Sequence, residues 1–244
     1  MRVLNVRIDD CDMAACVAKI EMWLAAFHGQ AGGMKQVITL NAEGVFIAKN
    51  DADFAALIES SDLVTPDGSG VVWAAKKYGY AGLARVAGID LLEKLCAVGQ
   101  DRDWSVYLLG GQPDIAALAG QNLLQRYPRL RIVGSENGYF REREQQVIEA
   151  INQAQPDLLF AGLGMPFQEK WLAARKQELQ VGVAIGVGGS FDVLSGSLKR
   201  APLWMQNLRL EWLYRLLQQP SRWRRFLVLP RFMAAVCRDS KRAI

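Results

Sequence analysis

The chain alternates between short apolar runs and longer segments in which apolar residues recur every three or four positions. The runs predict buried strands, and the periodic segments predict helices that bury one face. Residues 1–12 mix apolar and acidic positions, which favours a hairpin or an edge strand. We expect strands over residues 36–41, 62–64, 104–109, 130–134, 157–161 and 181–187, and helices over 13–27, 43–49, 53–60, 70–78, 91–98, 114–127, 141–153 and 168–176.

The alternation of strands with helices predicts an α/β fold. The run Val181-Gly182-Val183-Ala184-Ile185 is apolar throughout, as expected for a strand that is covered on both faces. We therefore expect a Rossmann-like, mostly parallel sheet with helices on both faces. In such a sheet, ligands bind beyond the carboxyl ends of the strands.

The pattern changes to helix alone from Ala201 onward. Residues 199–244 contain eleven Lys and Arg residues against two acidic ones, so this segment carries +9 and residues 1–198 carry −5 of the net +4. Three of the seven Trp residues lie in the same segment. We divide the chain into a Rossmann-like domain, residues 1–198, and a basic, Trp- and Arg-rich helical appendage, residues 199–244.

Two interpretations of the appendage stay open at this point. Indole and guanidinium groups together suit a membrane interface, where the ring lies at headgroup level and the cation meets lipid phosphate. The alternative is an ordinary helix that packs on the body. The apolar side chains could be covered by the body, by a neighbouring copy in a homo-oligomer, or by an anionic membrane surface. The acidic body argues against nucleic acid as a partner.

Composition narrows the class of protein further. Hydrophobic residues make up 51% of the 244 positions, yet no apolar run approaches the roughly 18 residues of a transmembrane helix. The N-terminal residues are rich in Asp and show no secretory signal, so we expect a cytoplasmic protein. The four cysteines include no Cys-x-x-Cys pair, which disfavours a zinc site or a disulfide framework.

The leading candidate for catalysis is Asp67, in the turn Pro66-Asp67-Gly68 between a predicted strand and a predicted helix. Proline fixes φ and glycine relieves strain, so this corner presents one carboxylate at the edge of the sheet. His28 is the only histidine, and it lies in a glycine-rich loop. We therefore expect a carboxylate to act as the general base, in preference to a Lys, Tyr or Cys. The alternative is that Pro66-Asp67-Gly68 is only a turn.

Glycine corners follow several predicted strands, at residues 110–111, 162–164 and 188–189. Such corners let backbone N–H groups approach a phosphate, so a nucleotide or diphosphate pocket fits the sequence. NAD is weakly supported, because neither Gly162-x-Gly164 nor Gly186-x-Gly188 has the third glycine of the dinucleotide fingerprint. The Asp-x-Asp patterns at residues 51–53 and 101–103 are best explained as solvated turns, so we predict no metal site.

Polar residues near the other strand ends have both a binding and a structural interpretation. Thr39 and Asn41 end a strand near the expected position of Asp67, where they could bind a sugar or a base. Asn41 could instead cap the following helix. Arg85 could clamp a phosphate or lie on the surface, and Gln168 could contact a ligand at the start of its helix.

A set of segments from about Val37 to the tail carries a family resemblance. The segments are Thr39-Leu40-Asn41-Ala42-Glu43, Thr65-Pro66-Asp67-Gly68 with Gly70-Val71-Val72-Trp73, Ala84-Arg85-Val86-Ala87-Gly88-Ile89-Asp90, Leu109-Gly110-Gly111, Gly162-Leu163-Gly164-Met165-Pro166 with Gln168-Glu169, and Gly188-Gly189-Ser190-Phe191-Asp192 followed by Lys199-Arg200-Ala201-Pro202. In this order, the set resembles the WecG/TagA/CpsF glycosyltransferases (glycosyltransferase family 26). Each segment alone is weak, but the set is specific.

The resemblance implies an inverting, metal-independent glycosyltransferase that needs no cofactor and lies on the inner face of the cell membrane as a peripheral protein. Members move a sugar from a UDP-sugar to a polyprenyl-diphosphate-linked sugar. The best-known members, in teichoic-acid synthesis, add N-acetylmannosamine to undecaprenyl-diphosphate-linked N-acetylglucosamine. Two alternatives from other classes are a nucleotide-dependent oxidoreductase, which would bind NAD(H), and a non-enzymatic membrane or nucleic-acid adaptor.

The resemblance also implies roles for individual residues. It assigns the catalytic base to Asp67. It places the substrate pocket at Thr39, Asn41, Arg85 and Gln168, with Asp192 as a further pocket residue. It assigns contacts with diphosphate near the membrane to three appendage arginines, Arg215, Arg222 and Arg225. Phe167 departs from the family pattern, because many members are expected to have a basic residue at this position.

Overall fold

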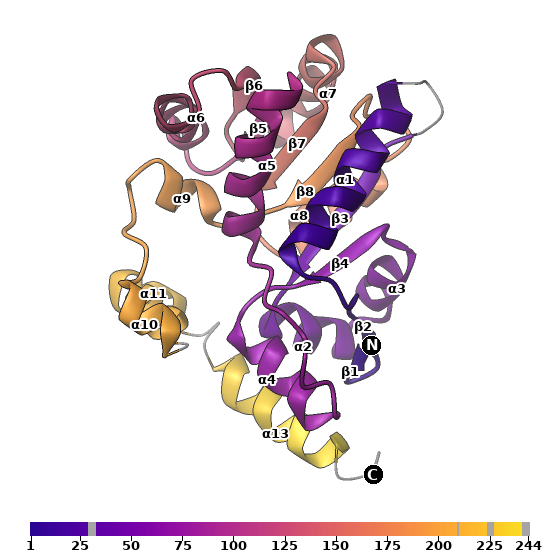
Figure 1. The fold of residues 1–244 in the computed structure, drawn as a ribbon, viewed down its shortest axis with the longest axis vertical. Coiled ribbons are helices and arrows are strands. Elements are labelled where there is room, and N and C mark those ends of the chain that lie inside the picture. Colours follow the sequence, from indigo (N-terminus) through magenta and orange to yellow (C-terminus); the bar gives the residue numbers. More distant parts are fainter. Residues whose placement is uncertain (29–32, 209, 224–226, 241–244) are drawn as a thin grey trace.

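A six-stranded, all-parallel sheet runs through the molecule (Figure 1). The computed structural model describes residues 1–28, 33–208, 210–223 and 227–240. The strand order is β4 (Leu63–Pro66), β3 (Lys35–Leu40), β8 (Val183–Gly186), β7 (Leu158–Gly162), β5 (Ser105–Gly110) and β6 (Arg131–Glu136). The predicted α/β class and the Rossmann-like parallel sheet are confirmed.

Helices cover both faces of the sheet, because side chains alternate between the two faces along each strand. On one face, alternate strand residues pack with α1 (Met13–His28), α5 (Gly88–Arg102) and α6 (Ile115–Arg126). On the other face, the intervening strand residues pack with α7 (Glu144–Ala154) and α8 (Phe167–Ala174). The short turn η1 (Arg141–Arg143) leads into α7.

A third hydrophobic cluster, the β3–β4 core, closes the end of the sheet that carries these two strands. It includes the N-terminal hairpin, in which β1 (Arg2–Val3) pairs antiparallel with β2 (Val6–Arg7). This pairing confirms the predicted hairpin. The same core includes residues of α2 (Ala42–Asn50), α3 (Ala52–Ser60) and α4 (Ser69–Lys77).

The appendage is helical, as its pattern predicts. Its elements are α10 (Leu203–Asn207), α11 (Glu211–Gln218), η2 (Pro220–Arg222) and α13 (Val228–Ser240). Helix α13 runs beside α2 and α4 (Figure 1), and its Phe232 and Val236 are fully buried in the β3–β4 core. The last helix therefore shares a hydrophobic core with the body. The division of the chain at residue 199 stays a prediction.

Two helices differ from the sequence predictions. Helix α5 begins at Gly88, three residues before the predicted start at Leu91. The early start suits glycine, since a Cβ at Gly88 would lie only 3.0 Å from the Thr39 hydroxyl oxygen. Helix α9 (Ser190–Leu194) was not predicted, because five residues are too few to establish a helical period. Among the described helices, none is long and apolar enough to span a bilayer.

Candidate active site

The candidate residues of the body gather at the carboxyl edge of the sheet. Thr39 lies near the end of β3, Asn41 follows that strand, and Asp67 follows β4. Since Leu40 of β3 pairs in register with Pro66 of β4, Asn41 and Asp67 leave neighbouring strands at the same level. This is the edge at which parallel sheets bind their ligands.

Asp67 is a partly buried carboxylate that is held by its backbone. Its N–H donates to the Leu40 carbonyl at 2.9 Å. Burial raises the pKa of Asp67 from 3.8 to about 6, while the Arg85 guanidinium and the backbone N–H of Gly88 oppose this rise. A carboxyl with this pKa is ionised at neutral pH and remains basic enough to accept a proton from a reacting hydroxyl.

An ion-pair network connects this corner to the appendage. The Arg85 guanidinium lies 2.6 Å from the carboxylate of Glu211, at the start of α11. The other oxygen of Glu211 lies 3.5 Å from Arg200, which also pairs with Asp90 at 2.6 Å. Glu211 and Asp90 add to the rise in the pKa of Asp67. The appendage thus contributes an acidic residue at the edge of the site.

Glu211 was not among the residues predicted from the sequence to belong to the site. The sequence offers one indication of its importance: Glu211 is one of only two acidic residues in the strongly basic segment 199–244. The Nε atoms of Arg85 and Arg200 are buried and have no hydrogen-bond partner among the described residues. Arg85 and Arg200 both lie against the Glu211 carboxylate, and Arg200 also pairs with Asp90.

Gln168 links two of the glycine corners. Its Oε1 accepts hydrogen bonds from the N–H groups of Gly164 and Gly188, both at 3.1 Å. Its Nε2 donates to Glu169 at 2.7 Å, and the residue is 1% exposed. These two glycine N–H groups are engaged within the protein, so Gln168 holds the loops after β7 and β8 together. A direct contact between Gln168 and substrate stays a prediction.

Glu169 is a second buried carboxyl at this edge, and the sequence did not indicate its burial. Burial raises its pKa from 4.5 to about 7, and the hydrogen bond from Gln168 opposes the rise. Its Oε2 has no hydrogen-bond partner within the described part of the chain. Since Gln168 joins Glu169 to the two loops, the charge on Glu169 is coupled to the geometry of this edge.

Thr39 and Asn41 both have partners within the protein. The Thr39 hydroxyl donates to the Gly186 carbonyl at 2.6 Å and so ties β3 to β8. The Asn41 side-chain oxygen accepts from Gly44 N–H at 2.9 Å, which makes Asn41 the cap of α2. The structural interpretation of Asn41 is therefore confirmed. Contact of either residue with a sugar or a base stays a prediction.

Arg215 brings a cation from α11 to the loop after β8. Its guanidinium donates to the Gly189 carbonyl at 3.3 Å. A Cβ at Gly189 would lie 2.0 Å from Arg215 Nη2 and 3.1 Å from a carboxylate oxygen of Asp192. A side chain at position 189 would therefore displace the Arg215 guanidinium from its place against this loop. Of the other two predicted arginines, Arg225 and the side chain of Arg222 lie outside what the structure describes.

Residues that the sequence analysis set aside lie away from this edge or in turns. His28 contacts Asp157, which precedes β7 at the amino edge of the sheet. Asp51 caps α3 and Asp103 ends α5, as expected for residues in turns. Within the described ranges, no group of three or more His, Cys, Asp or Glu residues is placed to hold a metal ion. Phe167 is 39% exposed, with the Arg141 guanidinium 5.6 Å from its ring centroid.

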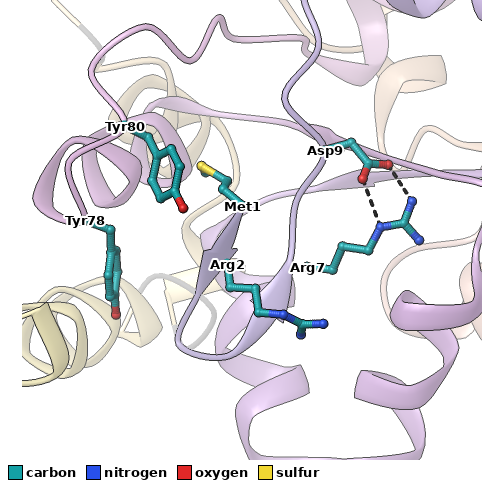
Figure 2. A pocket seen from close by; sticks show the side chains of 6 residues that line it. All are labelled: Met1, Arg2, Arg7, Asp9, Tyr78 and Tyr80. Atoms are coloured by element: carbon teal, nitrogen blue, oxygen red, sulfur yellow. Dashed lines mark hydrogen bonds and ion pairs between the residues drawn. The ribbon is translucent and has the colours of Figure 1, made fainter. Parts of the chain in front are cut away.

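A hollow of about 520 Å³ lies beside the N-terminal hairpin and contains none of the candidate residues. Figure 2 shows Arg7 paired with Asp9 through two hydrogen bonds, at 2.9 and 2.8 Å. Arg2, also on its wall, pairs with Glu59 at 2.8 Å. Because nearby carboxylates neutralise both arginines, this hollow offers an anion little attraction.

Comparison with known proteins identifies the family. The profile of the glycosyl transferase WecG/TagA/CpsF family matches residues 1–243. The chain belongs to this family. It is 37% identical over 205 residues to N-acetylglucosaminyldiphosphoundecaprenol N-acetyl-beta-D-mannosaminyltransferase of Bacillus subtilis (strain 168), a match that covers 84% of this chain and 80% of that protein. The protein of the same name from Bacillus spizizenii (strain ATCC 23059 / NRRL B-14472 / W23) is 35% identical over 205 residues, a match that covers 84% of this chain and 79% of that protein.

Membership of the WecG/TagA/CpsF family confirms the resemblance seen in the sequence. It makes the chain a glycosyltransferase, and it sets aside the oxidoreductase and adaptor alternatives. The relatives' names identify N-acetylmannosaminyl transfer and a diphosphoundecaprenol-linked N-acetylglucosamine.

Proposed function

We propose that this protein transfers N-acetylmannosamine from UDP-N-acetylmannosamine to N-acetylglucosaminyl-diphosphoundecaprenol. The position of Asp67 is the observation that carries the proposal. It is a carboxylate at the carboxyl edge of the sheet, with a pKa of about 6 and with Arg85 beside it. The donor and the acceptor are proposed by analogy with the activity named for the two relatives.

In the proposed reaction, Asp67 accepts the proton of the acceptor hydroxyl while the hydroxyl oxygen attacks the anomeric carbon of the donor sugar. The bond from that carbon to UDP breaks on the opposite face. This single displacement inverts the configuration, so an α-linked donor gives the β-mannosaminide that the relatives' names specify. The pKa of about 6 supports the role, because most of the protein then carries an ionised Asp67 at neutral pH.

The departing diphosphate needs positive charge, and we propose that arginines supply it in a metal-independent mechanism. Arg215 lies against the loop after β8, and Arg85 lies near Asp67. Guanidinium groups form paired hydrogen bonds with phosphate oxygens. Glu211, which now pairs with Arg85, would have to release it when an anionic substrate binds.

We also propose that the appendage meets an anionic membrane surface. Several of its apolar side chains are more than half exposed: Leu203 (75%), Leu217 (68%), Leu208 (62%), Trp204 (61%) and Trp223 (51%). Lipid would cover these side chains, while the basic residues of the segment would meet phosphate headgroups. Such an enzyme would bind its lipid-linked acceptor at the bilayer surface.

The decisive experiment measures UDP release from UDP-N-acetylmannosamine in EDTA, with and without a short-chain lipid-diphosphate N-acetylglucosamine. Acceptor-dependent release would support the donor, the acceptor and the metal-independent mechanism together. If no release occurs, a panel of other UDP-sugars tests the donor assignment. Failure of every UDP-sugar, in turnover and in binding, would refute the proposed function. The variant Asp67→Asn should lose transfer, and the same change at the exposed Asp10 should not.

Membrane binding is tested by flotation of the full chain with anionic and with neutral vesicles. Full-length variants are needed, because a truncation after Gln219 would remove the buried Phe232 and Val236. Replacing Leu203 and Trp204 with Ser should reduce flotation with anionic vesicles several-fold. Unchanged flotation of this double variant would contradict the proposed role of α10.

A further inference from the structure

A groove lies between α4 and α10. It has a volume of about 290 Å³. Three of its residues, Ser69, Val72 and Lys76, are spaced three and four positions apart and so share one face of α4. The rest of the lining consists of Ala81, Leu83, Arg85 and Gln206.

This groove lies near the proposed reaction centre, although Asp67 itself is not part of its lining. Ser69 is two residues from Asp67 in the chain, and Arg85 both lines the groove and lowers the pKa of Asp67. The helix rises about 1.5 Å per residue, so Ser69 and Lys76 are about 10 Å apart along α4. A molecule with one end at Asp67 could therefore lie along this face of the helix.

The lining combines an apolar floor with positive charge. Val72 and Leu83 are 8% and 6% exposed, and they form the apolar part of the wall. Arg85 is the cation near Asp67, and Lys76 is a second cation, seven residues beyond Ser69 on α4. Lys76 is exposed and forms no ion pair with any described residue. The next residue, Lys77, instead lies 5.9 Å from the ring centroid of Trp73.

One residue of the groove wall comes from a helix that also carries exposed apolar side chains. Gln206, on its wall, belongs to α10, and the same helix carries Leu203 and Trp204, which are 75% and 61% exposed. A volume of about 290 Å³ is at the small end of ligand pockets, which run from roughly 300 to 1,000 Å³. The groove could therefore enclose only the head of a long lipid, and the rest of the chain would pass over α10.

We propose that this groove binds the diphosphate and the first isoprene units of the lipid-linked acceptor, with Lys76 as a cation for the diphosphate. The proposal rests on the proposed function, and it adds a subsite and its residues. A UDP-sugar has no apolar segment to place on Val72 and Leu83. An isoprenyl diphosphate supplies both an anion for Lys76 and an apolar chain for Val72 and Leu83.

The first test compares Lys76→Ala with Lys77→Ala in steady-state transfer, using a short-chain acceptor in solution without vesicles. Loss of one charged contact should raise the acceptor KM of the Lys76 variant roughly ten- to hundredfold. The donor KM should stay the same. The Lys77 variant removes the same charge one position away and should behave like the parent. Equal acceptor KM values for the parent and the Lys76 variant would overturn the assignment.

The second test measures binding without turnover, so it does not depend on the donor sugar. Isothermal titration calorimetry of the full chain uses farnesyl diphosphate, farnesol and inorganic diphosphate as separate probes. Farnesyl diphosphate should bind more tightly than either of the others, and Lys76→Ala should weaken it at least tenfold. Ala81→Trp, at an exposed position on the wall, should block it, with circular dichroism as the check on folding.

The outcomes separate this proposal from the proposed function. Binding of inorganic diphosphate as tight as that of farnesyl diphosphate would mean a simple anion site and would overturn the isoprenoid assignment. Transfer by the parent, with unchanged binding and KM in the Lys76 and Ala81 variants, would refute the groove alone. Absence of transfer with every UDP-sugar, together with Lys76-dependent binding of farnesyl diphosphate, would refute the proposed function and support the groove.

Discussion

The change Asp67→Asn is expected to stabilise the protein while it abolishes transfer. Burial raises the pKa of Asp67 from 3.8 to about 6, so the folded protein binds a proton here more tightly than the unfolded chain does. Stability from this group is therefore greatest below pH 4, falls as the pH rises toward 6, and stays low above that. At neutral pH the ionised carboxylate opposes folding.

The size of the gain in the free energy of unfolding follows from the shift in the pKa of Asp67. At about 1.36 kcal/mol per pH unit, a rise from 3.8 to about 6 corresponds to about 3 kcal/mol. Because Asp67 is only partly buried, solvent screening reduces this figure, and we expect Asp67→Asn to gain about 1–2 kcal/mol at pH 8. For a domain of this size that is roughly 2–8 °C in Tm. The gain should vanish near pH 4, where the carboxyl is protonated.

The assay pairs urea unfolding at pH 8 and pH 4 with the transfer measurement, and it uses Asp10→Asn as the matched surface change. Transfer by Asp67→Asn should fall by about 10²–10⁴, the usual contribution of a general base. The parent's kcat/KM should fall tenfold per pH unit below about pH 6. A destabilised Asp67→Asn protein at pH 8, or the same stability difference at both pH values, would refute the reasoning about this carboxylate.

Three further substitutions test the surrounding structure. Glu211→Gln removes a negative charge that raises the pKa of Asp67, so the acidic limb of the kcat/KM profile should move to lower pH; an unmoved limb would contradict this coupling. Gln168→Ala leaves two backbone N–H groups without their acceptor, so it should lower the free energy of unfolding, measured in urea, by about 2–4 kcal/mol. A loss below about 1 kcal/mol would show that the link between the loops is dispensable. Phe232→Ala should lower the free energy of unfolding by about 3–5 kcal/mol if α13 is part of the core. The control Met233→Ala changes a side chain that is 48% exposed and should lower it by less than about 0.5 kcal/mol.

Much of the fold was predictable because burial leaves a local pattern in the sequence. Every strand of the sheet was predicted to within a few residues, and most of them are apolar runs that are buried on both faces; β6, at one edge, is the exception, since none of its residues is fully buried. The strand order was not predicted, because no local pattern states which strands are neighbours. Helix α9 was missed because its five residues are set by the loop after β8.

A residue of the site could be predicted only where its neighbours in the sequence mark its position. Asp67 was found because Pro66 and Gly68 mark a corner after a strand. Glu211 was missed because its importance comes from its pairing with Arg85, which is 126 residues away in the chain. The Sγ atoms of Cys11 and Cys16 also meet at 3.0 Å, although their spacing matches no familiar motif. Contacts that depend on long-range packing leave little trace in a single sequence.

The β3–β4 core has a consequence for how the molecule folds and opens. It joins Val3 of the hairpin to Val236 of α13, whereas the other two clusters draw on residues between 16 and 194. Contacts between such distant segments form late, because a long loop must close before they can form. We expect β4 and α13 to exchange their amide hydrogens as one cooperative unit, separately from strands β5, β6 and β7. The half of the molecule that holds Asp67 would then assemble last and open first.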